Sequence, residues 1–266
     1  MKIAVVNTKG GTGKTTFAIN VLPLILDNIL ILEADNNNKT KLQNSKIEIK
    51  NLFANEEDKL ITELLFNDYR NVVIDAGGGD DVKKVLKTLS KNDVLIDYFF
   101  ILVTQDYETL KNLEDTINLI KQNFKNARII LVLNKVNNIE TIKQEFLFLF
   151  GNNELGIENI LKTKFKDTFY NIVAIRNNTL ISYIKNIYKQ TLKDFLEDLK
   201  IFEQYNLASL QKKWVIDCKK QYENEQEAKE CFKKKYNKFK LYREVKKFEE
   251  EVKEQLKFLK GDNNAS

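Results

Sequence analysis

Residues 9–16 read Lys9-Gly10-Gly11-Thr12-Gly13-Lys14-Thr15-Thr16, and this stretch decides the fold of the 266-residue chain. It lies between an apolar, β-branched run at 2–7, which predicts a buried strand, and a helix expected over 14–26. A glycine-rich turn in this context points several backbone N–H groups inward, at the positive end of the helix dipole. The stretch therefore predicts a phosphate-binding loop. Lys14 would reach the β- and γ-phosphates of a nucleotide, and the Thr15 hydroxyl would complete a Mg²⁺ shell.

Short apolar runs alternate with segments of helical period over about the first 190 residues. Further strands are expected at 29–32, 71–75, 98–103, 127–133 and 171–175, and helices at 56–67, 80–89, 108–124, 139–150 and 178–188. Residues 36–54 are polar and are predicted to be irregular. Apolar strands separated by helices predict an α/β fold with a doubly wound, mostly parallel sheet, whose ligands bind beyond the carboxyl ends of the strands.

Carboxylates stand at two of these strand ends. Glu33-Ala34-Asp35 follows the second expected strand, and the apolar run 72–74 ends in Asp75. A carboxylate at that position would hold Mg²⁺ through a water beside Thr15. Three consecutive glycines, residues 77–79, come next and suggest a mobile switch loop close to the γ-phosphate.

The phosphate loop departs from the standard pattern, because Thr8 stands where a glycine is usual and a second lysine, Lys9, precedes Gly10. The run resembles the deviant Walker A motif, KGGxGK[ST], of the ParA/MinD family of ATPases. The resemblance covers about residues 1–190. It implies a P-loop domain that binds ATP and Mg²⁺ through the loop, and a homodimer that sandwiches two nucleotides. In that dimer Lys9 would reach the partner's phosphates, as an arginine finger does, and tie hydrolysis to dimerisation. The resemblance assigns nucleotide contacts to Gly10, Gly11, Thr12, Gly13, Lys14, Thr15 and Thr16.

Further site residues follow from the same resemblance. Asp35 matches the position that orients the attacking water and contacts Mg²⁺ through water, so the implied catalytic residues are Lys9, Lys14 and Asp35. The implied metal-binding residues are Thr15, Asp35 and Asp75. Asn134 resembles the asparagine that reads the adenine edge, since an amide offers both a donor and an acceptor. Position 137 is not the aspartate of the GTPase Asn-Lys-x-Asp pattern, which favours ATP. Arg176 has two alternative roles, in the base pocket or in DNA contacts.

The character of the sequence changes at about residue 191, which divides the chain into an ATPase domain at 1–190 and a basic helical extension at 191–266. Two or three helices are expected in the extension, where Val245, Phe248, Val252, Leu256 and Leu259 form one apolar stripe. Residues 212–247 hold 13 basic and 6 acidic side chains, among several aromatic ones. This segment would contact DNA phosphates, pack as a hairpin on the body, or form a helical interface with a partner or a second copy. A membrane-surface helix at 245–259 is a further alternative, which the acidic run 249–251 disfavours.

The composition excludes other kinds of chemistry. The chain has no histidine, which rules out His-based acid–base catalysis and His-ligated metals. Its two cysteines, Cys218 and Cys231, match no CxxC spacing, and two reduced thiols are expected. No stretch approaches the ~20 apolar residues of a membrane span, and the first residues lack a signal-peptide core. A cytoplasmic protein is therefore expected, associated with the nucleoid if it binds DNA.

The resemblance implies a slow ATPase, stimulated by dimerisation and by a small DNA-binding adaptor protein. It would position or segregate plasmid or other DNA cargo and bind DNA non-specifically. One alternative is an accessory protein of conjugation or mobilisation, which the three glycines at 77–79 support. Another is a MinD-like ATPase that positions itself at a membrane, although a membrane partner is not expected.

Overall fold

The computed structural model describes residues 1–36, 40, 42 and 45–261. Its strands form one sheet in the order β3-β2-β4-β1-β5-β6-β7, with every neighbouring pair parallel. This confirms the predicted doubly wound α/β architecture, in which each parallel strand needs a crossover connection. The strands are β1 (Lys2–Val6), β2 (Ile29–Ala34), β3 (Glu48–Leu52), β4 (Asn71–Ala76), β5 (Tyr98–Val103), β6 (Ile129–Val136) and β7 (Asn171–Arg176).

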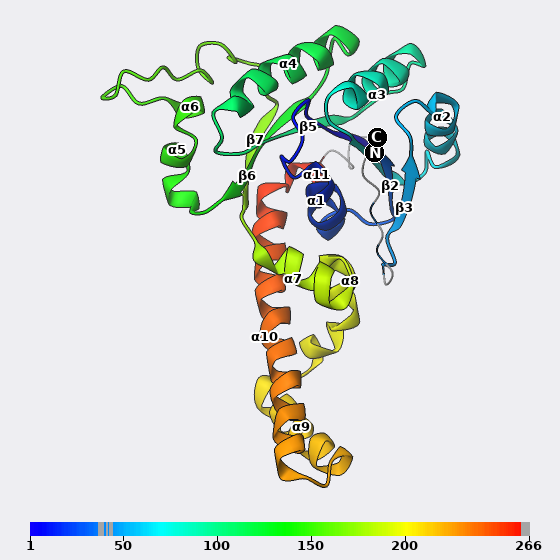
Figure 1. Cartoon of the computed structure of the whole chain (residues 1–266), viewed down its shortest axis with the longest axis vertical. Helices are drawn as coiled ribbons and strands as arrows, with labels where there is room; N and C mark the ends of the chain where they lie inside the picture. The colour runs from blue at the N-terminus through cyan, green and yellow to red at the C-terminus, as the bar shows by residue number, and fades with distance from the viewer. Residues whose placement is uncertain (37–39, 41, 43–44, 262–266) are drawn as a thin grey trace.

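Helices cover both faces of the sheet (Figure 1). One face packs against α2 (Glu57–Phe66), α3 (Asp80–Lys91), α4 (Glu108–Asn123), α5 (Ile142–Glu145) and α6 (Leu147–Phe150), while η3 (Ile139–Thr141) has no buried residue. The other packs against α1 (Lys14–Thr16), η1 (Phe17–Val21), η2 (Leu22–Leu24), α7 (Thr179–Tyr188), α8 (Leu192–Asp198) and the end of α10 (Glu225–Gln255). Along β1, Ile3 and Val5 join one apolar cluster while Ala4 and Val6 join the other. This burial on both sides is why the strands are unbroken apolar runs.

Three regions differ from the sequence prediction, and the first is the helix expected over 14–26, which is divided into α1, η1 and η2. Residues 48–52 form the edge strand β3, paired with β2 from Leu30↔Glu48 to Ala34↔Leu52, where irregular chain was expected. An edge strand needs no continuous apolar run, so its Glu-Ile-Lys-Asn-Leu sequence escapes a search for one. The helix expected over 139–150 is divided into η3, α5 and α6. Part of the 36–54 segment lies outside the described residues.

The extension contains more helices than expected: α8, η4 (Lys200–Gln204), α9 (Leu207–Gln221), α10 and α11 (Phe258–Gly261). Its predicted apolar stripe is buried in the same cluster as the helix that follows the phosphate loop. Between these anchored parts, α9 and the first half of α10 form an antiparallel hairpin that projects from the body (Figure 1). We call residues 206–240 the arm. None of the helices in the described part of the chain is long and apolar enough to cross a membrane.

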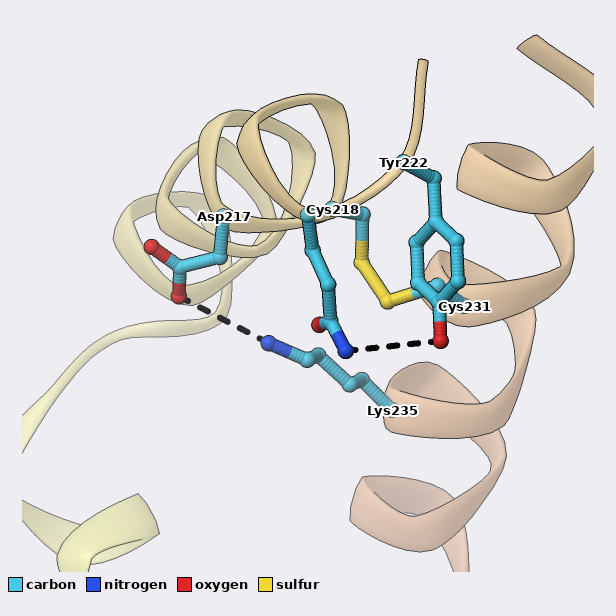
Figure 2. The surroundings of a disulfide bond; sticks show 6 residues. Asp217, Cys218, Tyr222, Cys231 and Lys235 are labelled. Atoms are coloured by element: carbon cyan, nitrogen blue, oxygen red, sulfur yellow. Dashed lines mark hydrogen bonds and ion pairs between the residues drawn. A yellow bond between two sulfur atoms is a disulfide. The ribbon is translucent and has the colours of Figure 1, made fainter. Parts of the chain in front are cut away.

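The arm has its own small core and a disulfide. Leu210, Trp214 and Phe239 form an apolar cluster separate from the body. Farther out, Cys218 and Cys231 are joined by a disulfide (Figure 2), so the expectation of two reduced thiols is wrong for this structure. The antiparallel turn brings the two side chains face to face, which a spacing of 13 residues along the chain does not reveal.

Candidate functional site

The phosphate loop leaves β1 at the carboxyl edge of the sheet and is held by its neighbours. Asn7 donates from Nδ2 to the carbonyl of Leu102 on β5 at 2.6 Å, and its Oδ1 accepts from the backbone N–H of Lys9 at 2.7 Å. Thr8, the residue that replaces the usual glycine, donates from its backbone N–H to Oγ1 of Thr116 on α4 at 3.1 Å. These bonds fix the start of the loop between β5 and α4. The Thr8 hydroxyl also donates to the carbonyl of Asn112 on α4 at 3.3 Å, a bond that glycine could not make.

Asn134 holds the middle of the same loop. Its Nδ2 donates to the carbonyl of Thr12 at 2.8 Å, and both side chains are buried. Gly13 has a φ of +94°, and a Cβ added to it would lie 2.5 Å from Nδ2 of Asn134. The conformation and the close approach both require glycine here. Asn134 therefore braces the phosphate loop in this structure, and its contact with an adenine stays a prediction.

A cavity of about 480 Å³ opens beside the loop, at the carboxyl ends of the strands. Most of the predicted site residues line it: Gly10, Gly11, Gly13, Lys14, Thr15, Thr16, Asp35, Asn134 and Arg176. Thr12 does not line it, because its side chain points into the protein and only its backbone remains for a phosphate. Sequence reasoning assigned no role to Asn178, Ile181 and Ser182, which complete the wall of the cavity after β7. The last predicted strand pointed to this segment, but its residue types indicated no chemistry.

Lys14 is the buried cation of the cavity. Its side chain lies inside the loop, with only 7% of the residue exposed, and Nζ donates to the carbonyl of Lys9 at 3.2 Å. Burial lowers the pKa of Lys14, while the carboxylates of Asp75 and Asp35 oppose that shift. A lysine held in this way loses little freedom when it meets a phosphate, because the loop has already placed it.

Asp75 is the buried anion, at the end of β4. Its pKa is raised to about 7, chiefly by burial. Within that net value a hydrogen bond with Thr15 and the charge of Lys14 lower the pKa, whereas the nearby Glu33 and Asp35 raise it. Glu33 is the direct cross-strand neighbour of Asp75 in the β2–β4 register, so the two carboxyl groups share one face of the sheet. The charge of Glu33 thus adds to the electrostatic cost of ionising Asp75.

The carboxylate of Asp75 fits a metal site. Its Oδ1 is buried and has no hydrogen-bond partner among the described residues, beside the Thr15 hydroxyl and near Asp35. An unpartnered buried oxygen is costly, and a hard divalent cation prefers such oxygen ligands. The donor set of Thr15, Asp75 and Asp35 therefore suits Mg²⁺.

The chain after β4 passes close to Asp35 and to the phosphate loop, and the three glycines at 77–79 make this approach possible. A Cβ added to Gly77 would lie 3.2 Å from Cγ of Asp35, and one added to Gly78 would lie 3.3 Å from the backbone nitrogen of Gly10. Gly79 has a φ of +58° and donates to the carbonyl of Thr8 at 2.8 Å. The glycines thus have a steric reason inside the site, and the mobility of this loop stays a prediction.

Asp81 and Asp106 support the site although no motif marked them. Asp81 accepts from the backbone N–H of Asn36 at 3.0 Å and so fixes the chain directly after Asp35. Asp106 lies before α4 and forms an ion pair with Lys9, which also meets Oε2 of Glu108 at 3.5 Å. The hydrogen bond with Asp106 raises the pKa of Lys9. Lys9 is therefore held by acids of its own chain and does not line the cavity.

Arg176 connects the cavity to the extension. It ends β7, and its guanidinium lies 3.3 Å from the carboxylate of Glu251 on α10. Two residues earlier, the backbone N–H of Ala174 donates to Oε1 of Gln255 at 3.0 Å. The end of α10 thus covers the open edge of β7 and touches a residue of the nucleotide cavity. The base-pocket and DNA roles of Arg176 both stay predictions.

A parallel sheet with a glycine-rich phosphate loop, a buried lysine and strand-end carboxylates defines a P-loop nucleotide-binding protein. Residues 3–164 match the model of the CobQ/CobB/MinD/ParA nucleotide binding domain, and the chain belongs to this family. No curated protein sequence matches the chain.

Solved structures with a similar chain trace include three of related kinds. The MinC:MinD cell division protein complex of Aquifex aeolicus shows 14% identity and a TM-score of 0.48, covering 75% of this chain and 89% of that chain. A putative plasmid partition protein from Borrelia burgdorferi, bound to AMPPNP, shows 18% identity and a TM-score of 0.44, covering 71% and 90%. Apo McdA from Cyanothece shows 12% identity and a TM-score of 0.43, covering 70% and 89%.

Proposed function

We propose that the chain is a Mg-ATP-dependent ATPase that dimerises when ATP is bound and positions or segregates plasmid or other DNA cargo. The carrying observation is the cavity beside the phosphate loop, which Lys14 and Asp35 line, with the buried carboxyl group of Asp75 close enough to interact with both. Residues 1–190 would form the ATPase domain and residues 191–266 the basic helical extension. A small DNA-binding adaptor protein that stimulates hydrolysis, and a cytoplasmic, nucleoid-associated location, belong to the same proposal.

The residues of the cavity suit phosphoryl transfer to water. Backbone N–H groups of the loop and Lys14 would bind the β- and γ-phosphates of ATP, and Asp35 would orient the attacking water. Thr15, with Asp75 and Asp35 through water, would hold Mg²⁺, which supplies positive charge to the phosphates when it is bound. The adenine would lie towards Asn134 and Arg176, which both line the cavity.

Lys9 would act in the partner's site. In this structure it is bound to Asp106 and Glu108, away from its own cavity. We propose that docking of a second copy releases Lys9 from these acids and places it on the partner's phosphates. A cation that arrives only in the dimer stabilises the charge of the transition state, so hydrolysis would depend on dimerisation.

DNA binding is proposed for a basic band on α10, defined as residues 233–247, which hold eight basic residues and one acidic residue. Within the described residues, Lys233, Lys234 and Lys247 take part in no ion pair. The nearby aromatic side chains pack into the arm and the body. Phosphates rather than stacked bases are therefore the expected ligand, without sequence specificity.

The two alternative functions have weaker support. The accessory role in conjugation or mobilisation depended on the glycines after β4, which the nucleotide site itself explains. The membrane role needs an exposed apolar stripe on α10. Val245, Phe248 and Val252 of that stripe are buried in the body core.

The test compares dimerisation with hydrolysis. Light scattering with size exclusion and phosphate release would be measured with ATP and with ADP, for the wild type and for Lys14→Ala, Lys9→Ala and the exposed-surface control Lys84→Ala. We expect an ATP-dependent dimer for the wild type and the control, no nucleotide binding for Lys14→Ala, and nucleotide binding without hydrolysis for Lys9→Ala. Normal turnover by Lys9→Ala would refute the sandwich mechanism.

A further inference from the structure

The outer end of the arm is tied by the disulfide between Cys218, in the last turn of α9, and Cys231, in the second turn of α10 (Figure 2). Their Cα atoms lie 5.8 Å apart, a usual separation for a bridged pair. Thirteen positions separate the two cysteines, and the turn between the helices lies within that interval. The disulfide therefore closes a short loop around the tip of the arm.

Apolar packing between the two helices ends before this tip. The arm's cluster contains Leu210, Trp214 and Phe239, with Phe232 and Tyr236 partly buried against it. Between residues 215 and 235, Cys218 and Ala228 are the only buried side chains. Two buried small side chains remove little apolar surface from water, so the hydrophobic effect holds this end weakly.

Polar contacts add little at the tip. Asp217 and Lys235 form an ion pair at 3.6 Å across the two helices (Figure 2), but both side chains are more than one-third exposed. Exposed pairs of this kind contribute little and are screened by salt. The Gln221–Tyr222 hydrogen bond joins neighbours along the chain and does not connect α9 to α10. Among the described residues, the disulfide is thus the principal tie between the two helices at this end.

We infer that Cys218 and Cys231 form a thiol–disulfide exchange site that sets the order of the arm's outer end. The reaction partners are small disulfides and small thiols of the glutathione class. When the pair is oxidised the tip is a closed hairpin, and when it is reduced the ends of α9 and α10 fray. This inference does not depend on nucleotide binding, dimerisation or DNA.

The different burial of the two cysteines sets the order of the exchange steps. Cys231 is partly exposed, whereas Cys218 is 1% exposed, so an incoming small disulfide meets Cys231 first. The Cys231 thiolate attacks one sulfur of that disulfide, which breaks its S–S bond and releases one small thiolate. The Cys218 thiolate then attacks the sulfur of Cys231 in the mixed disulfide and releases the second. Two protein thiols are oxidised, one small disulfide is reduced, and the two protons go to the two small thiols released.

The size of the effect follows from the loop. In the chain-entropy treatment, closing a 13-residue loop favours the closed form by roughly 100-fold. Opening of the tip should therefore become roughly 100-fold more frequent on reduction, with the ATPase body unaffected. Because the basic band begins at Lys233, two residues after Cys231, fraying would also reach its first turn.

Hydrogen exchange of the full chain, followed by mass spectrometry, tests this inference. The wild type would be measured after glutathione disulfide and again after dithiothreitol, beside the double variant Cys218→Ser/Cys231→Ser. We expect roughly 100-fold faster exchange in peptides spanning 215–232 on reduction, and no change in peptides of α3 and α4. The double variant should exchange rapidly there whether or not reductant is present.

Intact mass provides the independent readout, because closing the disulfide removes two hydrogens and leaves no adduct. Two free thiols, or a persistent glutathione adduct, after incubation with glutathione disulfide would overturn the inference. So would equal exchange at 215–232 in the oxidised and reduced wild type. Both measurements use the wild type itself, so they test the inference even if the double variant fails to fold.

Discussion

Replacing Asp75 by asparagine should change how the stability of the nucleotide-free protein depends on pH. Burial raises the pKa of Asp75 from an ordinary value of 3.8 to about 7. The folded protein therefore holds a proton that the unfolded chain releases between these two values. Stability contributed by the protonated group is fully present below pH ~4 and is lost as the pH rises through about 7.

The loss can be worked out from the shift. A pKa difference of about 3 corresponds to roughly 4 kcal/mol at ~1.4 kcal/mol per pH unit, most of it developing between pH 4 and 7. Asp75→Asn cannot ionise, so it should not share this loss. Relative to the wild type, the variant should gain several kcal/mol between pH 4.5 and 8.

Urea unfolding of the nucleotide-free proteins at several pH values measures the difference. The matched control is Asp115→Asn, the same chemical change at an exposed position on α4. Its difference from the wild type should stay within about 0.5 kcal/mol, as is usual for surface substitutions. A difference between Asp75→Asn and the wild type that does not change from pH 4.5 to 8 would refute the reasoning, because it would mean that Asp75 is not held protonated by the fold.

Three other outcomes can be measured directly. Asp35→Ala should bind ATP and dimerise but release phosphate at least 100-fold more slowly, which light scattering and a phosphate assay check together; loss of the dimer would contradict this role. Asn134→Ala removes a buried hydrogen bond to the phosphate loop, and a loss of ~1–3 kcal/mol in binding is expected by calorimetry. An equal loss for ATP and GTP would indicate that Asn134 braces the phosphate loop. A loss for ATP alone would indicate that Asn134 contacts the adenine. Neutralising three lysines of the basic band should lower the magnitude of the slope of log K against log salt for duplex DNA by ~2.7. An unchanged slope would exclude the band as the DNA-binding surface. The variant is Lys233→Gln/Lys234→Gln/Lys247→Gln, and its control is Lys84→Gln/Lys87→Gln/Lys111→Gln.

Charge substitution is the sharper test of the extension because truncation disturbs the fold. Removing everything beyond about residue 200 would delete Val245, Phe248 and Val252, which are buried in the body core with α8 and η1. A loss of DNA binding after that truncation would then have two explanations, an exposed core or a missing contact with DNA. Glutamine keeps most of the length of the lysine side chain and leaves these packed residues in place.

The phosphate loop and the strands that position it could be predicted because their signals are local. Gly13 needs its left-handed backbone whatever lies around it, and a strand such as β4 is an apolar run because both faces of the sheet are covered. The strand-end carboxylates Asp35 and Asp75 followed from the same logic, since parallel strands bring their carboxyl ends to one edge. Edge strand β3 was missed because only two of its five residues are apolar and only Leu52 is buried.

By itself, the sequence determined the class of the protein, the phosphate loop and the edge of the sheet where a nucleotide binds, because each rests on neighbours along the chain. Only the tertiary structure decided the partners of these residues. It placed Asn134 on the phosphate loop and Lys9 on Asp106, paired Cys218 with Cys231, and packed the end of α10 into the body. These contacts join residues between 13 and more than 100 positions apart, and no local pattern specifies which distant side chain will fill a given space.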